Sequence, residues 1–211
     1  MDIKNLRLNY QKSAIDFSNA EDNPVQFFLN WFNDALEVNK DEANACVLST
    51  ISDENKPDSR VILLKAINES GFTFFTNYTS SKAIHIENNN NVALNFYWPE
   101  LERQVRISGV AQKISAKGSD AYFKSRPRES QLGAWVSEQS NVVELNHSFE
   151  SILNDLEKKF DGKEVERPLH WGGYCIAPNK VEFWQGRPSR LHDRLVYEID
   201  GNKWNKKRLA P

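Results

Sequence analysis

Hydrophobic residues recur along the chain at two spacings, first that of a helix and then that of strands. After a polar stretch over residues 1–22, Asn23 and Pro24 suit the cap and the first turn of a helix. The apolar positions that follow share one helical face: Val25, Phe28, Leu29, Phe32, Ala35 and Leu36. The pattern predicts a helix that begins at Pro24, preceded by a flexible N-terminal arm over residues 1–22.

From residue 45 onward, short apolar runs separated by turn residues predict strands. The expected strands cover 45–51, 60–67, 72–76, 92–97, 103–114, 174–177, 180–185, 195–199 and 203–209. Helices are expected over 80–88, 117–124 and 148–160, with a less regular stretch between the last two. Many short strands with helices inserted between them predict an α+β fold around a small barrel. We expect a single domain over residues 23–211.

Composition and charge restrict the class of partner. A chain of 211 residues suffices for one compact domain, and its formal net charge of -2 does not favour a nucleic-acid partner. The N-terminal residues lack the apolar stretch of a signal peptide, and no run approaches a membrane span. Cys46 and Cys175 lie far apart, with no CxxC pair. These features predict a cytoplasmic protein that acts on neither nucleic acid nor membranes.

Candidate phosphate ligands are side chains, because the glycine motifs of Rossmann and P-loop proteins are missing. Three basic stretches offer such side chains: Arg60 with Lys65, residues 126–130 (RPRES) with Tyr122 one turn earlier, and residues 187–194 (RPSRLHDR). The planar guanidinium of arginine donates two parallel hydrogen bonds to a phosphate. Each stretch alone also fits a solvated surface. Three of them in a slightly acidic chain favour an anionic ligand.

Aromatic residues and histidines allow more than one interpretation. Trp135, Trp171 and Trp184 could pack in the core or could form the wall of a site for a flat conjugated ring. The four histidines lack the close spacing of a zinc site, so no metal is expected. His192 lies between arginines in a polar segment, a setting in which a functional role and a structural one are equally compatible with the sequence.

Several stretches carry more specific motifs, in order along nearly the whole chain. They are RVILLK (60–65), LERQVRISG (101–109), RPRESQLGAWVSEQS (126–140), WGGY (171–174), EFWQG (182–186), RLHDR (190–194) and RLAP (208–211). Together they resemble the pyridoxine/pyridoxamine 5'-phosphate oxidase family. RLHDR and the spaced residues of 126–140 are specific, whereas RVILLK alone would be weak.

The resemblance implies an FMN-binding split β-barrel of mostly antiparallel strands with flanking helices. It also implies a homodimer with flavin mononucleotide (FMN) at the subunit interface. By motif, the FMN ligands would be Arg60, Val61, Ile62, Leu63, Leu64, Lys65, Phe75, Thr76, Ser81, Lys82, Gln104, Gln139, Ser140, Trp184 and Arg194. We expect Gln139 and Ser140 to reach FMN bound mainly by the other subunit.

The same resemblance implies the substrate ligands. These would be Arg7, Tyr10, Lys65, Tyr122, Arg126, Ser130, Arg190 and His192. Arg190 and His192 are the expected catalytic residues, which would hold the reacting ring. Arg7 and Tyr10 match a family pattern in which the N-terminal arm closes over the substrate. One departure stands out: the family usually has an arginine where this chain has Ser81, so one cation expected near the FMN phosphate is missing.

The activity implied by the resemblance is oxidation of pyridoxine 5'-phosphate or pyridoxamine 5'-phosphate to pyridoxal 5'-phosphate. Molecular oxygen would accept the electrons, and hydrogen peroxide would be released, with ammonia from the amine. Two alternatives remain at this point. One is a related split-barrel flavoprotein that oxidises another small molecule. The other is a non-catalytic barrel that binds flavin, haem or single-stranded nucleic acid.

Overall fold

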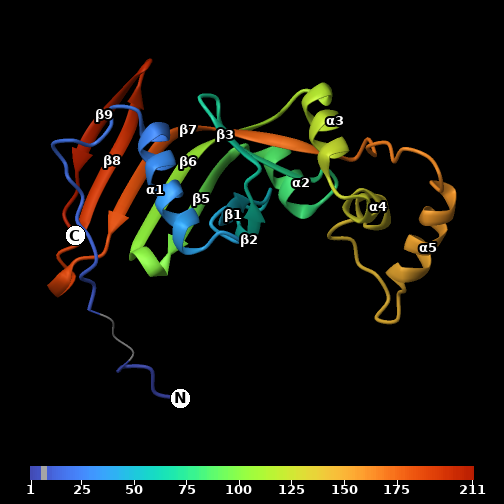
Figure 1. Cartoon of the computed structure of the whole chain (residues 1–211), viewed down its shortest axis with the longest axis horizontal. Helices are drawn as coiled ribbons and strands as arrows, with labels where there is room; N and C mark the ends of the chain where they lie inside the picture. Colours follow the sequence, from blue (N-terminus) through green and yellow to red (C-terminus); the bar gives the residue numbers. More distant parts are fainter. Residues whose placement is uncertain (6–8) are drawn as a thin grey trace.

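A nine-stranded antiparallel sheet is the frame of the described part of this computed structural model, residues 1–5 and 9–211 (Figure 1). The strands are β1 (Ala45–Ile51), β2 (Pro57–Leu63), β3 (Ala66–Asn68), β4 (Gly71–Asn77), β5 (Asn91–Trp98), β6 (Arg103–Lys113), β7 (Trp171–Gln185), β8 (Asp193–Asp200) and β9 (Lys203–Arg208). Their order is β2-β1-β5-β6-β7-β4-β3, and β8 joins β7 to β9. The first half of β7 pairs with β4 and the second half with β8, while β6 runs beside both halves. The predicted α+β class is confirmed.

The observed strands differ from the prediction at two points. The expected strand 60–67 is broken, because β2 ends at Leu63 and a separate strand, β3, begins at Ala66. The expected strands 174–177 and 180–185 are one continuous strand, β7. The sequence predicts an interruption of β7 between residues 177 and 180. Instead the strand continues there, and its pairing with β6 shifts register between Ser108 and Gly109.

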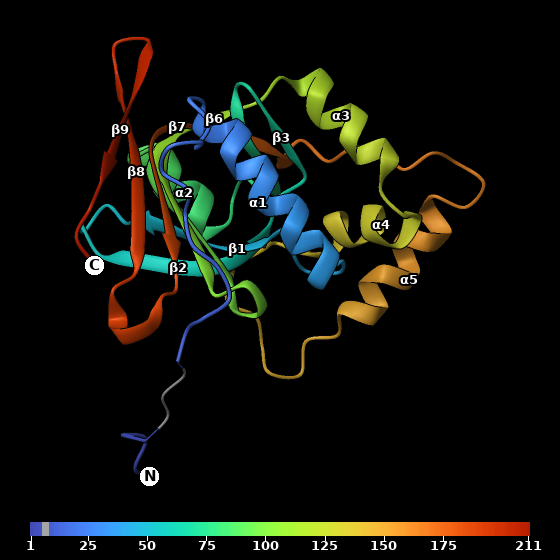
Figure 2. The ribbon, with the colours of Figure 1, turned by 60° about the vertical axis from the view of Figure 1, so that its left-hand side comes forward.

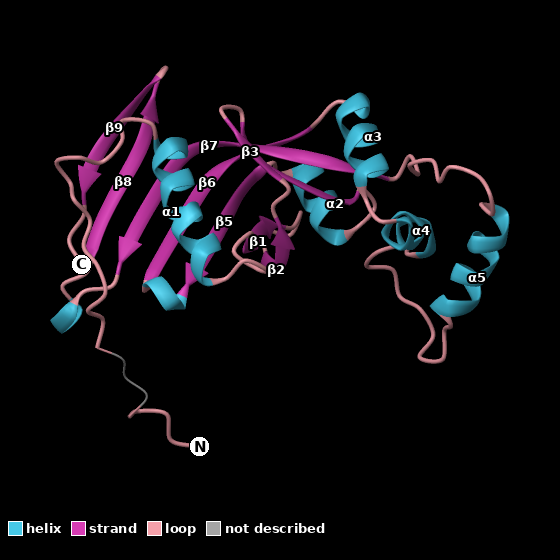
Figure 3. Ribbon diagram, in the orientation of Figure 1, coloured by secondary structure: helices cyan, strands magenta, loops and turns pink. Residues whose placement is uncertain are grey.

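Five α-helices lie outside the sheet in the described residues (Figure 3). They are α1 (Pro24–Val38), α2 (Ser81–Asn88), α3 (Ala116–Ser125), α4 (Arg128–Val136) and α5 (Phe149–Lys159), with two short 3-10 turns, η1 (Pro99–Leu101) and η2 (Pro188–Arg190). The helix α4 occupies the stretch that the sequence suggested was irregular. None of the described helices has the length and apolar character needed to cross a membrane.

The main core lies between α1 and the sheet, across which α1 runs (Figure 2). The Asn23 side chain accepts a hydrogen bond from the Val25 amide at 2.9 Å, so the predicted cap is confirmed. Phe28 is fully buried, and its ring centroid lies 5.0 Å from that of Phe72 on β4 and 5.0 Å from that of Phe96 on β5. These edge-on contacts fix α1 against the middle of the sheet.

A second, smaller core joins α3, α4 and α5 to the start of β7 at one end of the molecule (Figure 1). It contains Phe123 of α3, Leu132 of α4 and Phe160 just after α5, packed with Trp171. Because Trp171 is the first residue of β7, this core ties the helical end to the sheet. The position of α3 and α4 therefore follows from β7.

The segment before α1 is held against the domain over its second half. The amides of Gln11 and Lys12 donate to Glu102 Oε2 at 2.8 and 3.0 Å, and Ile15 is buried. The Tyr197 hydroxyl donates to the Glu21 carbonyl oxygen at 2.7 Å. Residues 10–22 therefore make specific contacts with the domain, and the flexible arm over residues 1–22 stays a prediction.

Candidate functional site

A pocket of about 260 Å³ lies between β2, β4, α2, α3 and β7. Its lining is Val61, Ile62, Leu63, Lys65, Phe75, Thr76, Lys82, Tyr122, Arg126, Gln139 and Trp171. An adjoining hollow of similar size shares five of these residues and adds Asn77, Ser130, Gly133, Ala134 and Ser137. The two hollows share lining residues and so form one site, which we call the cationic pocket.

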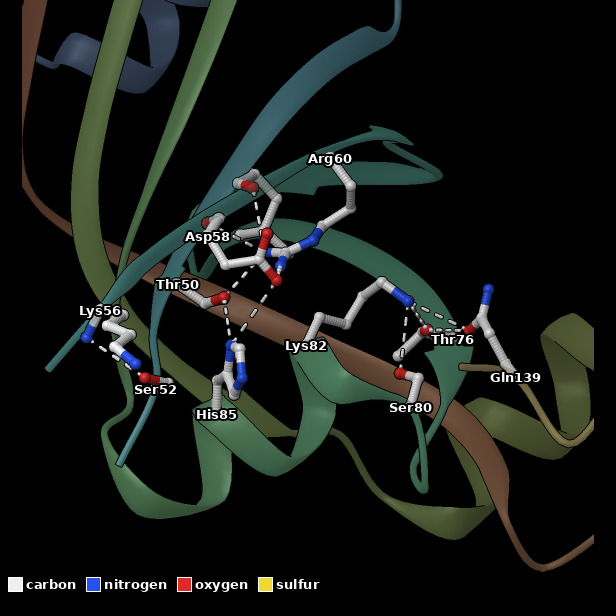
Figure 4. A network of polar contacts seen from close by, with 11 residues as sticks. Thr50, Ser52, Lys56, Asp58, Arg60, Thr76, Ser80, Lys82, His85 and Gln139 are labelled. Carbon is white, nitrogen blue, oxygen red and sulfur yellow. Dashed lines mark hydrogen bonds and ion pairs between the residues drawn. The ribbon is translucent and has the colours of Figure 1, made fainter. Parts of the chain in front are cut away.

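Lys82 provides a buried positive charge at one side of this pocket (Figure 4). Its Nζ donates to Thr76 Oγ1 at 3.2 Å, to Ser80 Oγ at 3.2 Å and to Gln139 Oε1 at 3.1 Å. Burial, and secondly the charge of Arg60, lower the pKa of Lys82 to about 8. An ammonium group surrounded by neutral acceptors favours an anionic ligand, which would supply the missing counter-charge.

Arg60 stands beside this charge on β2, with its guanidinium directed at β1 (Figure 4). Its Nη1 donates to Thr50 Oγ1 at 2.7 Å and to the Leu48 carbonyl oxygen at 3.2 Å, and its Nη2 pairs with Asp58. Arg60 does not line the pocket itself. Its charge lowers the pKa of Lys82, an effect that the carboxylate of Asp58 partly offsets.

Aromatic rings form the opposite wall. The Phe75 ring stacks on Tyr122, with centroids 3.9 Å apart and planes at 17°, and on Trp171 at 5.4 Å and 13°. The Arg126 guanidinium lies over Trp171, its Cζ 4.6 Å from the ring centroid. Arg126 Nη1 is buried and has no hydrogen-bond partner among the described residues, and burial lowers the pKa of Arg126. A buried donor without a partner indicates a ligand that accepts hydrogen bonds.

A second group of predicted site residues gathers near η2, and we call it the aromatic cluster. The ring centroids of Trp184 and His192 are 4.7 Å apart, and Tyr10 lies edge-on to both at 5.6 and 5.7 Å. His192 Nδ1 accepts a hydrogen bond from the Arg187 amide at 3.1 Å. Burial, then the charge of Arg190, lower the pKa of His192. The imidazole is therefore neutral near pH 7 and carries its proton on Nε2.

Three predicted FMN ligands form a row beside this cluster. Gln104 on β6 is paired with Trp184 on β7, which is paired with Arg194 on β8. Residues opposite one another in an antiparallel sheet point to the same face. Arg194 is fixed by Glu182 Oε1, which accepts from its Nε at 2.9 Å and from its Nη2 at 2.7 Å.

Left-handed backbone conformations occur at predicted site residues. Ser140 has φ 76°, Ser189 has φ 57° and Arg190 has φ 62°. Residues other than glycine rarely adopt such angles, and they persist where the surrounding structure enforces them. The three positions lie in the loop after α4 and in η2, which adjoin the cationic pocket and the aromatic cluster respectively.

The structure thus divides the predicted residues into two groups near opposite ends of the sheet (Figure 1). The cationic pocket contains residues 61–63 and Lys65, Phe75, Thr76, Lys82, Tyr122, Arg126, Ser130 and Gln139. The aromatic cluster and its row contain Tyr10, Gln104, Trp184, His192 and Arg194, with Arg190 nearby on η2. Gln139 lies in the pocket of its own chain, beside Lys82, and its reach to FMN of the other subunit stays a prediction.

Besides Arg60, three predicted FMN ligands lie in neither the pocket lining nor the aromatic cluster and its row. Leu64 is buried in the main core, and Ser81 begins α2. Ser140 is exposed, next to Gln139. The predicted substrate ligand Arg7 lies outside the described residues.

Sequence reasoning missed several residues at the site. Trp171 was left open between core and site, and it serves both, since it belongs to the second core and lines the pocket. Glu182, which fixes Arg194, lies in the EFWQG motif but had no assigned role. Thr50 contacts Arg60 because β1 and β2 pair in a particular register, and Asp58 contacts Arg60 because it lies two residues earlier on the same face of β2. A motif search cannot find such contacts.

The fold has close relatives among solved structures. PhzG from Burkholderia lata, solved in complex with tetrahydrophenazine-1-carboxylic acid, superposes with a TM-score of 0.89 at 26% identity, over 96% of this chain and 100% of that one. A pyridoxamine 5'-phosphate oxidase-related, FMN-binding protein from Nostoc punctiforme superposes at 0.71 with 16% identity, over 86% of this chain and 96% of that one. The chain is therefore a split β-barrel of the class that includes these proteins.

Sequence comparison narrows the class to a family. Residues 32–157 match the family model described as pyridoxamine 5'-phosphate oxidase, and residues 171–211 match the pyridoxine 5'-phosphate oxidase C-terminal dimerisation region. Pyridoxine/pyridoxamine 5'-phosphate oxidase from Leptospira biflexa is 48% identical over 100% of this chain and 99% of its own length. The protein of that name from Gloeothece citriformis is 49% identical over 99% and 98%. The chain belongs to the pyridoxamine 5'-phosphate oxidase family.

Proposed function

We propose that this protein is an FMN-dependent oxidase that converts pyridoxine 5'-phosphate and pyridoxamine 5'-phosphate to pyridoxal 5'-phosphate. Oxygen accepts the electrons, hydrogen peroxide is released, and the amine also yields ammonia. The observation that carries this proposal is the buried, unpartnered Nη1 of Arg126 in a pocket that also holds the ammonium of Lys82. We place the activity in the cytoplasm, where the unpaired Cys46 and Cys175 stay reduced.

The residues present fit FMN. Lys82 and Arg60 supply positive charge for the flavin phosphate, and Thr76 with Gln139 supplies hydrogen-bonding groups beside it. The segment 60–65 and Phe75 complete this side, together with Ser140. Gln104, Trp184 and Arg194 are proposed to contact the same flavin from the row across β6, β7 and β8. Bound FMN supplies the acceptor of the hydride that leaves the substrate.

The substrate phosphate is proposed to bind Lys65, Tyr122, Arg126 and Ser130. Binding energy from this phosphate is remote from the reacting carbon, so it helps to hold the pyridine ring in place. The neutral His192 presents an Nε2–H donor to a polar ring substituent, because the Arg187 amide occupies its Nδ1. Arg190 covers the ring, and Tyr10 closes the site beside His192.

A homodimer is required to bring the two groups together. Trp171 and Trp184 are the first and the penultimate residue of β7, and Trp171 lies in the cationic pocket while Trp184 lies in the aromatic cluster. At about 3.3 Å per residue, thirteen steps along a strand span roughly 40 Å. One small substrate therefore cannot contact both the cationic pocket and the aromatic cluster of the same chain. The match of residues 171–211 to a dimerisation region supports a site shared by two copies.

Exposed apolar side chains support the same assembly. Val61 and Leu63 line the cationic pocket and are 68% and 45% exposed. Tyr97, which pairs with Gln104 and so extends the row, is 50% exposed. Burial of these surfaces between two copies would remove apolar area from water on both sides of the site.

The alternatives make different predictions for one experiment. Purified protein is mixed with FMN and with each B6 phosphate, and aldehyde and peroxide are followed together. We expect stoichiometric aldehyde and peroxide from both phosphates, and much less from unphosphorylated pyridoxine. Flavin binding without turnover would indicate the non-catalytic barrel. Equal turnover of the phosphorylated and unphosphorylated substrates would overturn the role given to Arg126.

A further inference from the structure

The Arg60 side chain is only 19% exposed, and its guanidinium donates to four acceptors, which are the Leu48 and Asp58 carbonyl oxygens, Thr50 Oγ1 and the Asp58 carboxylate (Figure 4). Thr50 Oγ1 accepts from its Nη1 at 2.7 Å, and the carboxylate of Asp58 pairs with its Nη2. On the far side of Thr50, His85 Nδ1 lies 3.0 Å from Thr50 Oγ1 and 4.0 Å from Asp58 Oδ2. Arg60 therefore belongs to a network that reaches from β2 through β1 to α2.

The direction of the Arg60–Thr50 hydrogen bond is fixed by chemistry, whereas that of the Thr50–His85 hydrogen bond depends on the tautomer of His85. A guanidinium can only donate, so Thr50 Oγ1 must accept from Arg60. When the imidazole carries its proton on Nε2, His85 Nδ1 accepts the single hydroxyl proton of Thr50; in the other tautomer, Nδ1–H donates to the second lone pair of Thr50 Oγ1. His85 thus orients the Thr50 hydroxyl, and the Thr50 oxygen in turn aims its lone pair at Arg60.

The fold explains why these residues meet. In the β1–β2 pairing, Leu48 is opposite Arg60 and Thr50 is opposite Asp58, so the two acceptors on β1 flank the guanidinium. Thr50 is buried, being 1% exposed. His85 lies three residues after Lys82 on α2, a spacing that places both on one side of the helix. One helix therefore contributes Lys82 to the pocket and His85 to the support of Arg60.

We propose that Thr50 and His85 are positioning residues for the flavin phosphate, acting through Arg60. This inference rests on the proposed function, in which Arg60 and Lys82 meet that phosphate. A long arginine side chain that is already held in place loses less freedom when it binds an anion. Removing the support leaves the charge of Arg60 in place but lets the guanidinium adopt other rotamers.

Four variants in two matched pairs test this inference. Thr50→Val and His85→Leu remove the hydroxyl and the imidazole acceptor. Thr50→Ser keeps the hydroxyl, and His85→Asn keeps an acceptor near the position of Nδ1. Dissociation constants for FMN and for riboflavin, which lacks the phosphate, are measured by flavin fluorescence on each ligand-free protein, and thermal unfolding is recorded alongside.

We expect Thr50→Val and His85→Leu to lower the preference for FMN over riboflavin about 3- to 10-fold, as loss of one hydrogen bond would. Thr50→Ser and His85→Asn should retain most of the preference. Equal weakening of both flavins, or no change in the preference, would show that the network only supports the β1–α2 packing and would overturn the inference. If Thr50→Val fails to fold, the partly exposed His85 still decides the question.

The outcome for the unmodified protein separates the two proposals. A wild-type protein without preference for FMN over riboflavin would overturn the phosphate site itself, and the positioning role with it. A wild-type preference that all four variants keep would overturn the positioning role alone. Activity is not needed for either decision, because both depend on binding of the two flavins.

Discussion

The charge of Lys82 should make FMN binding and protein stability change in opposite directions. Replacing it by methionine removes an ammonium that is buried, at 8% exposure, among neutral acceptors. We expect Lys82→Met to stabilise the ligand-free protein near pH 7 and to weaken FMN binding. Lys82→Arg should keep FMN binding, since the guanidinium remains charged.

The magnitude follows from the pKa of Lys82, which burial and Arg60 lower from 10.5 to about 8. Between these values the unfolded chain carries a proton that the folded chain lacks, so the stability contributed by this group rises with pH over that interval. Below pH 8 the folded protein holds the buried charge, at a cost of up to about 3 kcal/mol. Lys82→Met removes this cost.

The acceptors left behind by Lys82→Met retain other partners. Ser80 Oγ still donates to the Asn77 carbonyl oxygen at 2.7 Å, and Thr76 Oγ1 donates to Gln139 Oε1 at 3.1 Å. We therefore expect a net stabilisation of about 1–3 kcal/mol at pH 7. A charge-assisted contact to phosphate is worth about 1.5–3 kcal/mol, so FMN should bind about 10- to 150-fold more weakly.

Thermal unfolding of the ligand-free protein and fluorescence titration with FMN and riboflavin, from pH 7 to 9.5, measure these quantities. Wild-type affinity for FMN should fall as pH rises above about 8, where Lys82 loses its proton in the ligand-free protein. Lys82→Met should abolish that fall, and riboflavin should show little of it. A less stable Lys82→Met protein, or equal losses for both flavins, would refute the reasoning.

Three further outcomes concern the other site residues. Arg126→Ala should mainly raise KM, whereas Arg190→Ala and His192→Ala should lower kcat, as steady-state kinetics would show; a change in KM alone for Arg190→Ala would remove its orienting role. Ser81→Arg should tighten FMN binding about 3- to 10-fold at low salt and less at high salt, measured by fluorescence titration; unchanged binding would mean that another group compensates. At a substrate concentration far below the raised KM of Arg126→Ala, co-refolded Arg126→Ala and His192→Ala chains should recover about a quarter of the wild-type rate, because half of the dimers are mixed and each has one intact site; no recovery would contradict the shared site.

The fold was largely predictable because local signals agreed with the tertiary structure. The cap at Asn23 and the apolar face of α1 indicated its start, and the bounds of most strands lie within two residues of the predicted ones. The errors have local causes. The sequence predicted less regular chain between residues 124 and 148, yet α4 begins directly after Pro127 and includes Gly133. Pro178 suggested a turn in β7, whereas the sheet continues through a register shift beside Gly109.

The close approach of the two strands at Gly109 depends on long-range packing. A Cβ there would lie 2.3 Å from the Ala177 carbonyl oxygen, so only glycine fits. The requirement is visible only when β6 and β7 are paired. The sequence motifs likewise identified which residues belong to the site, but not where the fold places them. They located Arg126 and His192, but their placement at two ends of the molecule follows from the sheet topology.

The length of β7 explains why the proposed site requires two copies of the chain. Trp171 at its start supports Arg126 in the cationic pocket, and Trp184 near its end packs on His192 in the aromatic cluster. In a symmetric dimer each copy then contributes its pocket to one site and its cluster to the other. In the proposed dimer, FMN between the two copies would contact both of them, so flavin binding and subunit association would stabilise each other. A ligand that binds only the assembled dimer therefore lowers the protein concentration at which dimers form.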